Sequence, residues 1–248
     1  MTDQTLTNHS LRDEIREYWS ERAATFDNDV GHRIDAGAEL AAWQALFERH
    51  LGPAEGRNLL DLASGTGEIS KLCQSLGFKV TGLDWSEPML ERARAKMPSI
   101  TFLQADAERP MLPEDSMDVL VTRHLVWTLV DPAAAFAAWH RVLKPGGTLL
   151  LVDGDFVSKG WVARLVSRLS PTPTNRNMER HHSILSRVHF SNGARAEAVV
   201  ELLKEAGFTD IRVDTDLRAI HRAQAQGLGW KKSLLRRSEH RYAISAKT

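Results

Sequence analysis

Apolar residues in the first fifty positions recur every third or fourth residue. Over residues 11–27 this period is filled by leucine, isoleucine, alanine and aromatic side chains, and it predicts an amphipathic helix. A second helix is expected over residues 36–51, where Gly52-Pro53 stops it. The chain therefore begins with a helical region.

Short apolar runs then alternate with helix-like stretches. The runs are typical of buried strands and cover residues 58–63, 79–83, 100–104, 117–122 and 148–153. Helices are expected between them at residues 68–76, 87–97 and 131–143, and a Lys-Pro-Gly-Gly break at 144–147 precedes the last of these strands. Repeated strand-helix-strand order predicts a parallel sheet covered by helices on both faces.

The pattern is less regular after residue 155. Residues 156–192 contain no clear strand, and a loop is expected at 170–173 between short helices. A helix over 194–206, a strand over 210–215 and a final strand near 242–246 follow. We predict a single α/β domain with a doubly wound, Rossmann-like sheet of seven strands. Its parts are a helical N-terminal cap (1–52), a core (53–155), an insertion that caps the substrate (156–193) and a C-terminal helix with two strands (194–248).

Composition narrows the possible functions. Lys plus Arg (32) equals Asp plus Glu (32), so charge favours neither nucleic acid nor an anionic membrane as a partner. The single cysteine, Cys73, excludes an internal disulfide and a cysteine-based metal cluster. The N-terminus is polar, and the apolar runs are too short to span a bilayer. A cytoplasmic protein without a membrane partner is expected.

The stretch LLDLASGTGEIS at residues 59–70 has the form of a nucleotide-binding turn. Gly65 and Gly67 allow a tight turn and a close approach of the backbone to a ligand. The third glycine of the dinucleotide fingerprint is replaced by Ser70. Glu68 stands where the next helix begins, which is unfavourable for a pyrophosphate and acceptable for a cationic ligand. The turn therefore favours a cationic nucleoside over a dinucleotide.

Four motifs in order resemble those of class I S-adenosylmethionine (SAM) methyltransferases. Residues 59–67 are similar to the family's first motif, although Ala63 stands where the family usually has glycine. Residues 80–86 resemble its second strand, whose terminal acid, here Asp84, binds both ribose hydroxyls. In residues 104–107 the acid that meets the adenine amino group is Asp106, and residues 141–147 resemble the stretch before strand five. The resemblance covers about residues 55–155 and implies SAM as the cofactor.

The resemblance also implies the residues that contact SAM. Alternatives stay open for several of them. The glycines could serve only the turn, Asp84 could cap a helix, and Asp106 could be a solvated turn residue. For Trp85, packing in the core is as well supported as contact with adenine. Asp61 is expected to support the turn through backbone hydrogen bonds rather than to touch the ligand. The expected cofactor-binding residues are Ala63, Ser64, Gly65, Gly67, Asp84, Trp85, Met89, Asp106, Ala107 and Arg123.

The methyl of SAM is already activated by its sulfonium, so catalysis depends mainly on alignment in a dry site. His124, just after the fourth strand, is the candidate general base; the alternative is a structural histidine packed under the cofactor. An Asn/Asp-Pro-Pro-Tyr/Phe motif, common in methyltransferases of nucleic-acid bases and protein amides, is missing there. A small-molecule acceptor is therefore favoured.

The substrate-binding candidates come from three regions. In this family the first helix often closes over SAM, and the basic insertion is suited to an anionic substrate; helix docking and a solvated basic face are the alternatives. A metal at His181-His182 is not expected, because adjacent residues rarely place both rings on one ion. The candidates are Tyr18, Trp19, His32, Trp127 and His181.

Residues 218–241 are basic and include Trp230 and Leu234-Leu235, a composition that also suits RNA or anionic lipid. We favour a crossover loop with a basic rim.

The overall prediction is methyl transfer from SAM to an O, N or S atom of a small metabolite. A non-methylating SAM enzyme that releases methylthioadenosine and a SAM-binding regulatory module are the alternatives. The sequence indicates neither the acceptor nor the oligomeric state.

Overall fold

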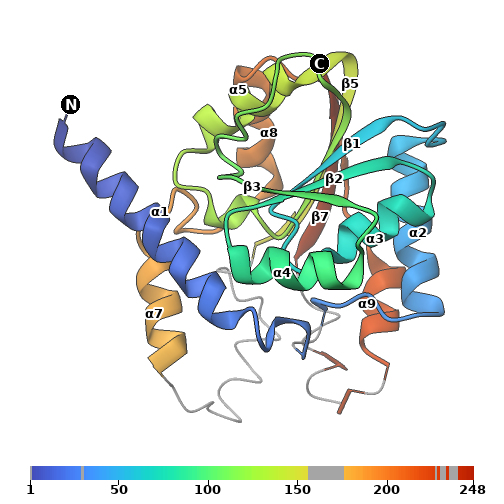
Figure 1. Cartoon of the computed structure of the whole chain (residues 1–248), viewed down its shortest axis with the longest axis horizontal. Coiled ribbons are helices and arrows are strands. Elements are labelled where there is room, and N and C mark those ends of the chain that lie inside the picture. The colour runs from blue at the N-terminus through green and yellow to red at the C-terminus, as the bar shows by residue number, and fades with distance from the viewer. Residues whose placement is uncertain (1, 29–30, 156–175, 227, 230–232, 235–239) are drawn as a thin grey trace.

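The computed structural model describes residues 2–28, 31–155, 176–226, 228–229, 233–234 and 240–248. Within them, seven strands form one sheet in the order β3-β2-β1-β4-β5-β7-β6 (Figure 1). The order reverses between β1 and β4, and in doubly wound sheets ligands bind outside the carboxyl ends of strands at such a reversal. The strands are β1 (Asn58–Leu62), β2 (Lys79–Asp84), β3 (Thr101–Gln104), β4 (Met117–Arg123), β5 (Leu143–Gly154), β6 (Thr209–Asp214) and β7 (Arg241–Lys247).

The doubly wound α/β prediction is confirmed, with one correction to strand direction. Strands β1 to β5 pair in parallel. Strand β7 lies between β5 and β6 and is antiparallel to both, so a wholly parallel sheet is wrong for this strand. An antiparallel strand can pair with its predecessor without a helical crossover. The alternation of apolar and polar residues does not encode that direction.

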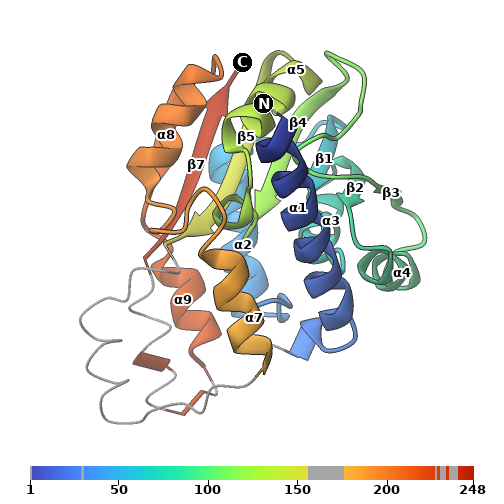
Figure 2. The same cartoon turned by 90° about the vertical axis from the view of Figure 1, so that its left-hand side faces the viewer.

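Helices cover both faces of the sheet. The buried clusters place α5 and α8 on one face and α2, α3 and α9 on the other. Both views show α1 and α7 side by side, and Figure 1 places them at the left of the molecule (Figures 1 and 2). The helices are α1 (Thr2–Arg22), η1 (Phe26–Asn28), α2 (Ala38–Leu51), α3 (Glu68–Ser75), α4 (Glu87–Lys96), η2 (Val126–Thr128), α5 (Pro132–Val142), α7 (Arg176–Leu185), α8 (Ala196–Glu205) and α9 (Arg218–Gln224).

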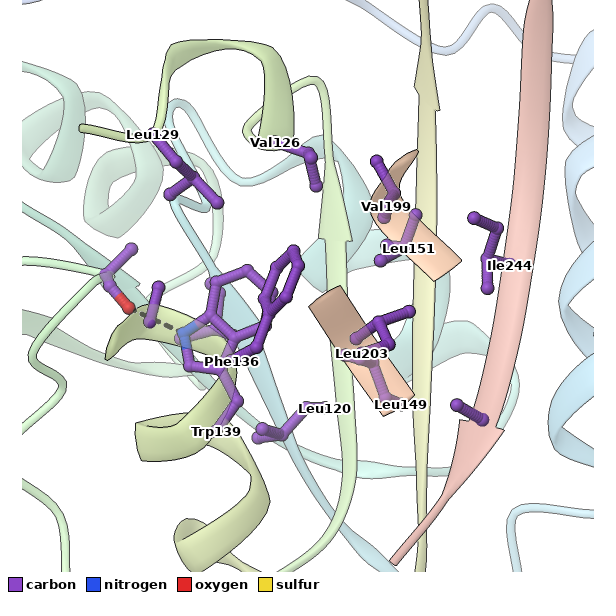
Figure 3. Packing of buried hydrophobic residues seen from close by; sticks show 14 of the residues in the cluster. Leu120, Val126, Leu129, Phe136, Trp139, Leu149, Leu151, Val199, Leu203 and Ile244 are labelled. Atoms are coloured by element: carbon purple, nitrogen blue, oxygen red, sulfur yellow. Dashed lines mark hydrogen bonds between the residues drawn. The ribbon is translucent and has the colours of Figure 1, made fainter. Parts of the chain in front are cut away.

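The continuous apolar runs of the central strands follow from burial on both faces. Along β5, Leu149 and Leu151 pack under α5 and α8, whereas Leu150 and Val152 face the opposite cluster (Figure 3). Successive side chains of a strand point to opposite faces, so a sheet covered on both sides needs apolar residues at every position. This core fixes the strand ends that carry the site.

Several predicted boundaries move. Helix α1 starts ahead of residue 11 and ends at Arg22, so the stretch up to residue 27 is not one helix; the separate turn η1 follows. Strand β5 starts five residues early, because its register against β4 jumps from Leu143 to Thr148 and the predicted Lys-Pro-Gly-Gly break lies within that irregularity. Part of the expected basic loop is helix α9.

The insertion is described only in part. Its second half contains helix α7, in agreement with the expected short helices, while the loop predicted at 170–173 lies outside the described residues. Among the described residues, none of the helices combines the length and apolar character needed to cross a membrane. The four-part division of the domain stays a prediction.

Candidate active site

A cavity of about 460 Å³ opens at the carboxyl ends of the strands, at the reversal of strand order. Its floor consists of the residues that follow β1, β2, β3 and β4. Helix α1, the turns η1 and η2, and helix α7 contribute the remaining walls. The cavity thus brings together most of the residues that the sequence nominates.

The turn after β1 forms one edge of the cavity. Ala63, Ser64 and Gly65 line it, and Ala63 and Gly65 both have a φ of 54°, in the left-handed region. Gly67 does not line the cavity. The φ of 88° at Gly67 favours glycine, and a Cβ there would lie 3.3 Å from Ala93 Cβ, so this glycine serves the backbone turn rather than ligand contact.

Asp84 ends β2 and is held by backbone amides on both sides. Its Oδ2 accepts a hydrogen bond from Gly65 N at 2.8 Å, and its Oδ1 accepts one from Ser86 N at 2.8 Å. Burial raises the pKa of Asp84, and the backbone amides of Ser86, Gly65 and Trp85 act in the opposite direction. Each carboxylate oxygen keeps a further lone pair for a ligand donor. Ser86, as expected, caps α4 with its side chain.

The residues after β2 and β3 form the neighbouring part of the wall. Trp85, Met89, Asp106 and Ala107 all line the cavity. The carboxylate of Asp106 accepts the amide of Glu108 at 2.9 Å, and burial raises the pKa of Asp106. The residues expected at the adenine end of SAM therefore lie together.

Helix α1 adds two arginines that sequence reasoning missed. Arg12 donates to the buried carboxylate of Glu108 at 2.6 Å, and Glu108 also accepts the amides of Val130 and Asp131. The guanidinium of Arg16 lies 5.3 Å from the centre of the Trp85 ring. The i, i+4 spacing of the two arginines was the available signal, because it puts both on one helix face.

Asp61 and Arg123 connect the centre of the sheet to the N-terminal segment. Asp61 accepts a hydrogen bond from Ser70 Oγ at 2.6 Å, and burial raises its pKa to about 7. Arg123 donates to the backbone carbonyl of His32, and its guanidinium lies 5.4 Å from the Trp43 ring. Asp61, Arg123 and His32 all line the cavity. Asp61 thus both accepts a hydrogen bond from a side chain of α3 and lines the cavity. The sequence predicts only that it supports the turn through backbone hydrogen bonds.

His124 directly follows β4 and has an unusual backbone. Its φ of 61° is in the left-handed region, which is strained for a residue with a side chain. Its amide donates to Val152 O at 3.0 Å, and its carbonyl accepts from Trp127 Nε1 at 2.9 Å. His124 lines the cavity and fixes Trp127.

Aromatic side chains line the helical side of the cavity. Trp19, Phe26, Trp127 and His181 are part of the lining. Tyr18, expected to bind substrate, does not line the cavity: it is 4% exposed and packs behind this wall. Tyr18 lies one helical turn before Arg22, and its hydroxyl accepts a hydrogen bond from Arg22 Nη1 at 2.9 Å.

Glu68 does not face the ligand site, contrary to the prediction from sequence. Glu68 begins α3 but does not line the cavity. It accepts Lys96 Nζ at 3.0 Å and the amide of Ile34 at 3.0 Å. Its charge is compensated by Lys96 rather than by a cationic ligand, and the same lysine lies 2.6 Å from Asp27 of η1.

Comparison with known proteins identifies the family. Residues 60–151 match the family model described as a methyltransferase domain. A solved SAM-dependent methyltransferase from Mesorhizobium loti superposes with a TM-score of 0.62 at 25% identity, over 87% of this chain and 100% of that one. The chain is a SAM-dependent methyltransferase.

Curated relatives agree with this assignment. The demethylmenaquinone methyltransferase of Renibacterium salmoninarum is 26% identical over 223 residues, which is 84% of this methyltransferase and 93% of the relative. That of Chlorobaculum tepidum is 33% identical over 158 residues, or 61% of this chain and 64% of the relative. Both relatives are named as methyltransferases, in agreement with this assignment.

The cavity fits SAM. Asp84 and Asp106 are at the strand ends where the family binds ribose and adenine, and the hydroxyl of Ser64 is buried in the cavity wall without a hydrogen-bond partner among the described residues. When bound, SAM supplies a methyl group on a positively charged sulfur. Among the described residues, no group of three or more metal-binding side chains occurs.

Proposed function

We propose that SAM binds at the ends of β1, β2 and β3 and that the methyl acceptor binds toward α1, η2 and α7. The observation that carries this assignment is Asp84. Two backbone amides fix its carboxylate at the cavity, with accepting capacity left for the two ribose hydroxyls. Trp85 and Met89 would contact the adenine, with Asp106 as the acceptor for its amino group.

The rest of the cavity supports alignment and exclusion of water. Trp19, Phe26, Trp127 and Leu129 give the acceptor side an apolar wall. Such a wall orients the nucleophile against the methyl group without competing hydrogen bonds from solvent. Arg123 donates a hydrogen bond to the His32 carbonyl and so holds the segment around His32 in place. We therefore assign Arg123 to closing the cavity over SAM.

Both curated relatives are named for demethylmenaquinone, which supports a small metabolite as the acceptor. The identity of that metabolite, the modified atom and a cytoplasmic location stay predictions. A role for His124 as general base is likewise a prediction from the sequence, and His181 is proposed for that role below.

Removal of the Asp84 carboxylate tests the proposal. Asp84→Ala should weaken S-adenosylhomocysteine (SAH) binding by at least about 100-fold, because two hydrogen bonds to a charged group, each about 1.5–3 kcal/mol, are lost. Calorimetric titration gives the Kd, and a thermal melt checks folding. Asp210→Asn, an exposed acid on β6, is the control and should bind SAH normally.

An unchanged Kd in the folded Asp84→Ala protein would remove this carboxylate from the site. The reaction products provide a second check: SAH is expected from an incubation with SAM and an accepted substrate. Methylthioadenosine released from SAM alone would instead favour a non-methylating reaction.

A further inference from the structure

Three rings form a continuous wall on the acceptor side of the cavity. The centroids of Trp19 and Trp127 are 6.3 Å apart with planes at 85°, and those of Trp127 and His181 are 5.5 Å apart at 61°. Tyr18 supports the wall from behind, 5.1 Å from Trp19 and 5.6 Å from His181. Steeply inclined rings offer a face next to an edge, an arrangement that suits a planar ring with its own face and edge.

The charges near this wall decide between two classes of ligand that aromatic walls bind: planar rings and ammonium groups. Such walls also hold ammonium groups by cation–π contact. Here the guanidinium of Arg22 already lies 5.7 Å from the Trp19 ring and 5.6 Å from the Tyr18 ring. The acids that line the cavity lie within or after β1, β2 and β3, and none lies on α1, η2 or α7, which carry the wall: Asp61, Asp84, Asp106 and Glu108. Repulsion between like charges therefore favours an uncharged or anionic ring over an ammonium.

His181 gives this wall a proton acceptor. Its side chain is half-buried and lines the cavity. Burial, the charge of Arg22 and the neighbouring His182 lower the pKa of His181, so the imidazole is neutral at neutral pH and one ring nitrogen has a free lone pair for a proton.

The charged and titratable groups around His181 come from α1 and α7. Helix α1 presents Tyr18 and Arg22 as well as Glu17 and Glu21; the two glutamates are engaged by Arg180, at 3.5 and 2.7 Å. Helix α7 itself adds Arg180 and the exposed His182, and η2 contributes the uncharged Trp127.

We propose that the acceptor is an aromatic ring bearing a hydroxyl group, that the ring packs against Trp19 and Trp127, and that His181 is the catalytic base. This deepens the proposed function and depends on it. As the hydroxyl oxygen attacks, its O–H bond breaks and the proton passes to His181. The oxygen electron pair forms the O–CH₃ bond, the pair of the broken methyl–sulfur bond stays on sulfur as a thioether, and His181 then releases its proton to water.

The geometry assigns a different task to His124. Its Nε2 is buried within the protein, and its carbonyl holds the indole of Trp127. His124 thereby positions the wall, whereas His181 is a ring of the wall itself.

Binding of model ligands tests the class of acceptor. With enzyme saturated by SAH, calorimetry compares 2-naphthol with its saturated counterpart decahydro-2-naphthol. The aromatic alcohol should bind about tenfold more tightly, as expected for one or two ring contacts. Trp127→Leu should abolish the difference and leave SAH affinity unchanged. Equal binding of the two alcohols to the wild-type enzyme overturns the proposal.

Turnover of phenols of graded acidity tests the base. His181→Gln should lower kcat for 2-naphthol about 100-fold at neutral pH, with recovery as rising pH ionises the phenol. The loss should be small for 4-nitrophenol, which ionises far more readily. His182→Gln, the adjacent exposed residue on the same helix, should keep kcat within about twofold of wild type.

Three outcomes overturn the assignment: an equal loss for all phenols, a pH-dependent loss in His124→Gln instead, or no methylated phenol at all. None of them affects the SAH titration of Asp84→Ala. A failure of this proposal is therefore distinguishable from a failure of the proposed function.

Discussion

The two halves of the cavity are built by different means. On the strand side, Asp84 is fixed by amides of its own turn and of the turn after β1, within 21 residues of chain. On the helix side, Trp19, Trp127 and His181 come from three elements and hold one another by ring contacts. Backbone amides allow little freedom of a side chain, whereas packed rings can adapt. The strand side therefore suits a ligand held in one fixed position, and the helix side suits a ligand to which the wall adapts.

The largest effect is expected where the two halves join. Glu108 is 6% exposed and accepts hydrogen bonds from Arg12 and from the amides of Val130 and Asp131. Glu108→Ala leaves a buried guanidinium and two amides without their acceptor, which should lower the free energy of unfolding by about 3 kcal/mol. Urea denaturation measures it, with exposed Glu114→Ala as the control. A loss as small as that of the control would show that α1 docks without this joint.

The next effect depends on pH and belongs to the strand side. Burial raises the pKa of Asp61 from its ordinary 3.8 to about 7 in the folded protein. Between these values the folded state keeps a proton that the unfolded state has released, so stability falls as pH rises through this window and is level above it.

Asp61→Asn removes that slope and retains an oxygen that can accept from Ser70. Relative to wild type, the variant should gain about 2 kcal/mol in unfolding free energy between pH 5 and pH 7. Denaturation at both pH values measures the gain. Parallel pH curves for the two proteins would contradict a buried, protonated Asp61.

The smallest effects come from a reciprocal pair of tryptophans. Trp19→Leu should raise KM for the acceptor about tenfold and leave the Kd of SAH within about twofold, because the indole belongs to the acceptor wall. Trp85→Leu should do the reverse, since Trp85 lines the cavity next to Asp84 in the chain and is assigned to the adenine. Each variant serves as the control of the other. If both changed KM and Kd alike, the division into two halves would be wrong.

The strand side was accessible from sequence because its determinants are local. Apolar runs gave the strands, and the spacing from the glycine turn to Asp84 follows from one helix and one strand between them. The helix side was accessible only in part: Trp19, Trp127 and His181 were named as candidates, but the ion pair of Arg12 with Glu108 spans 96 positions and carries no local signal. The direction of β7 and the irregular start of β5 are likewise set by pairing with distant strands.

A crystal structure of the SAH complex would test the central claim most directly. The account predicts both ribose hydroxyls within hydrogen-bond distance of the Asp84 carboxylate, the adenine beside Asp106 and Trp85, and the sulfur directed toward the wall of Trp19 and Trp127. A complex in which the ribose makes no contact with Asp84, or in which the sulfur faces away from that wall, would contradict it.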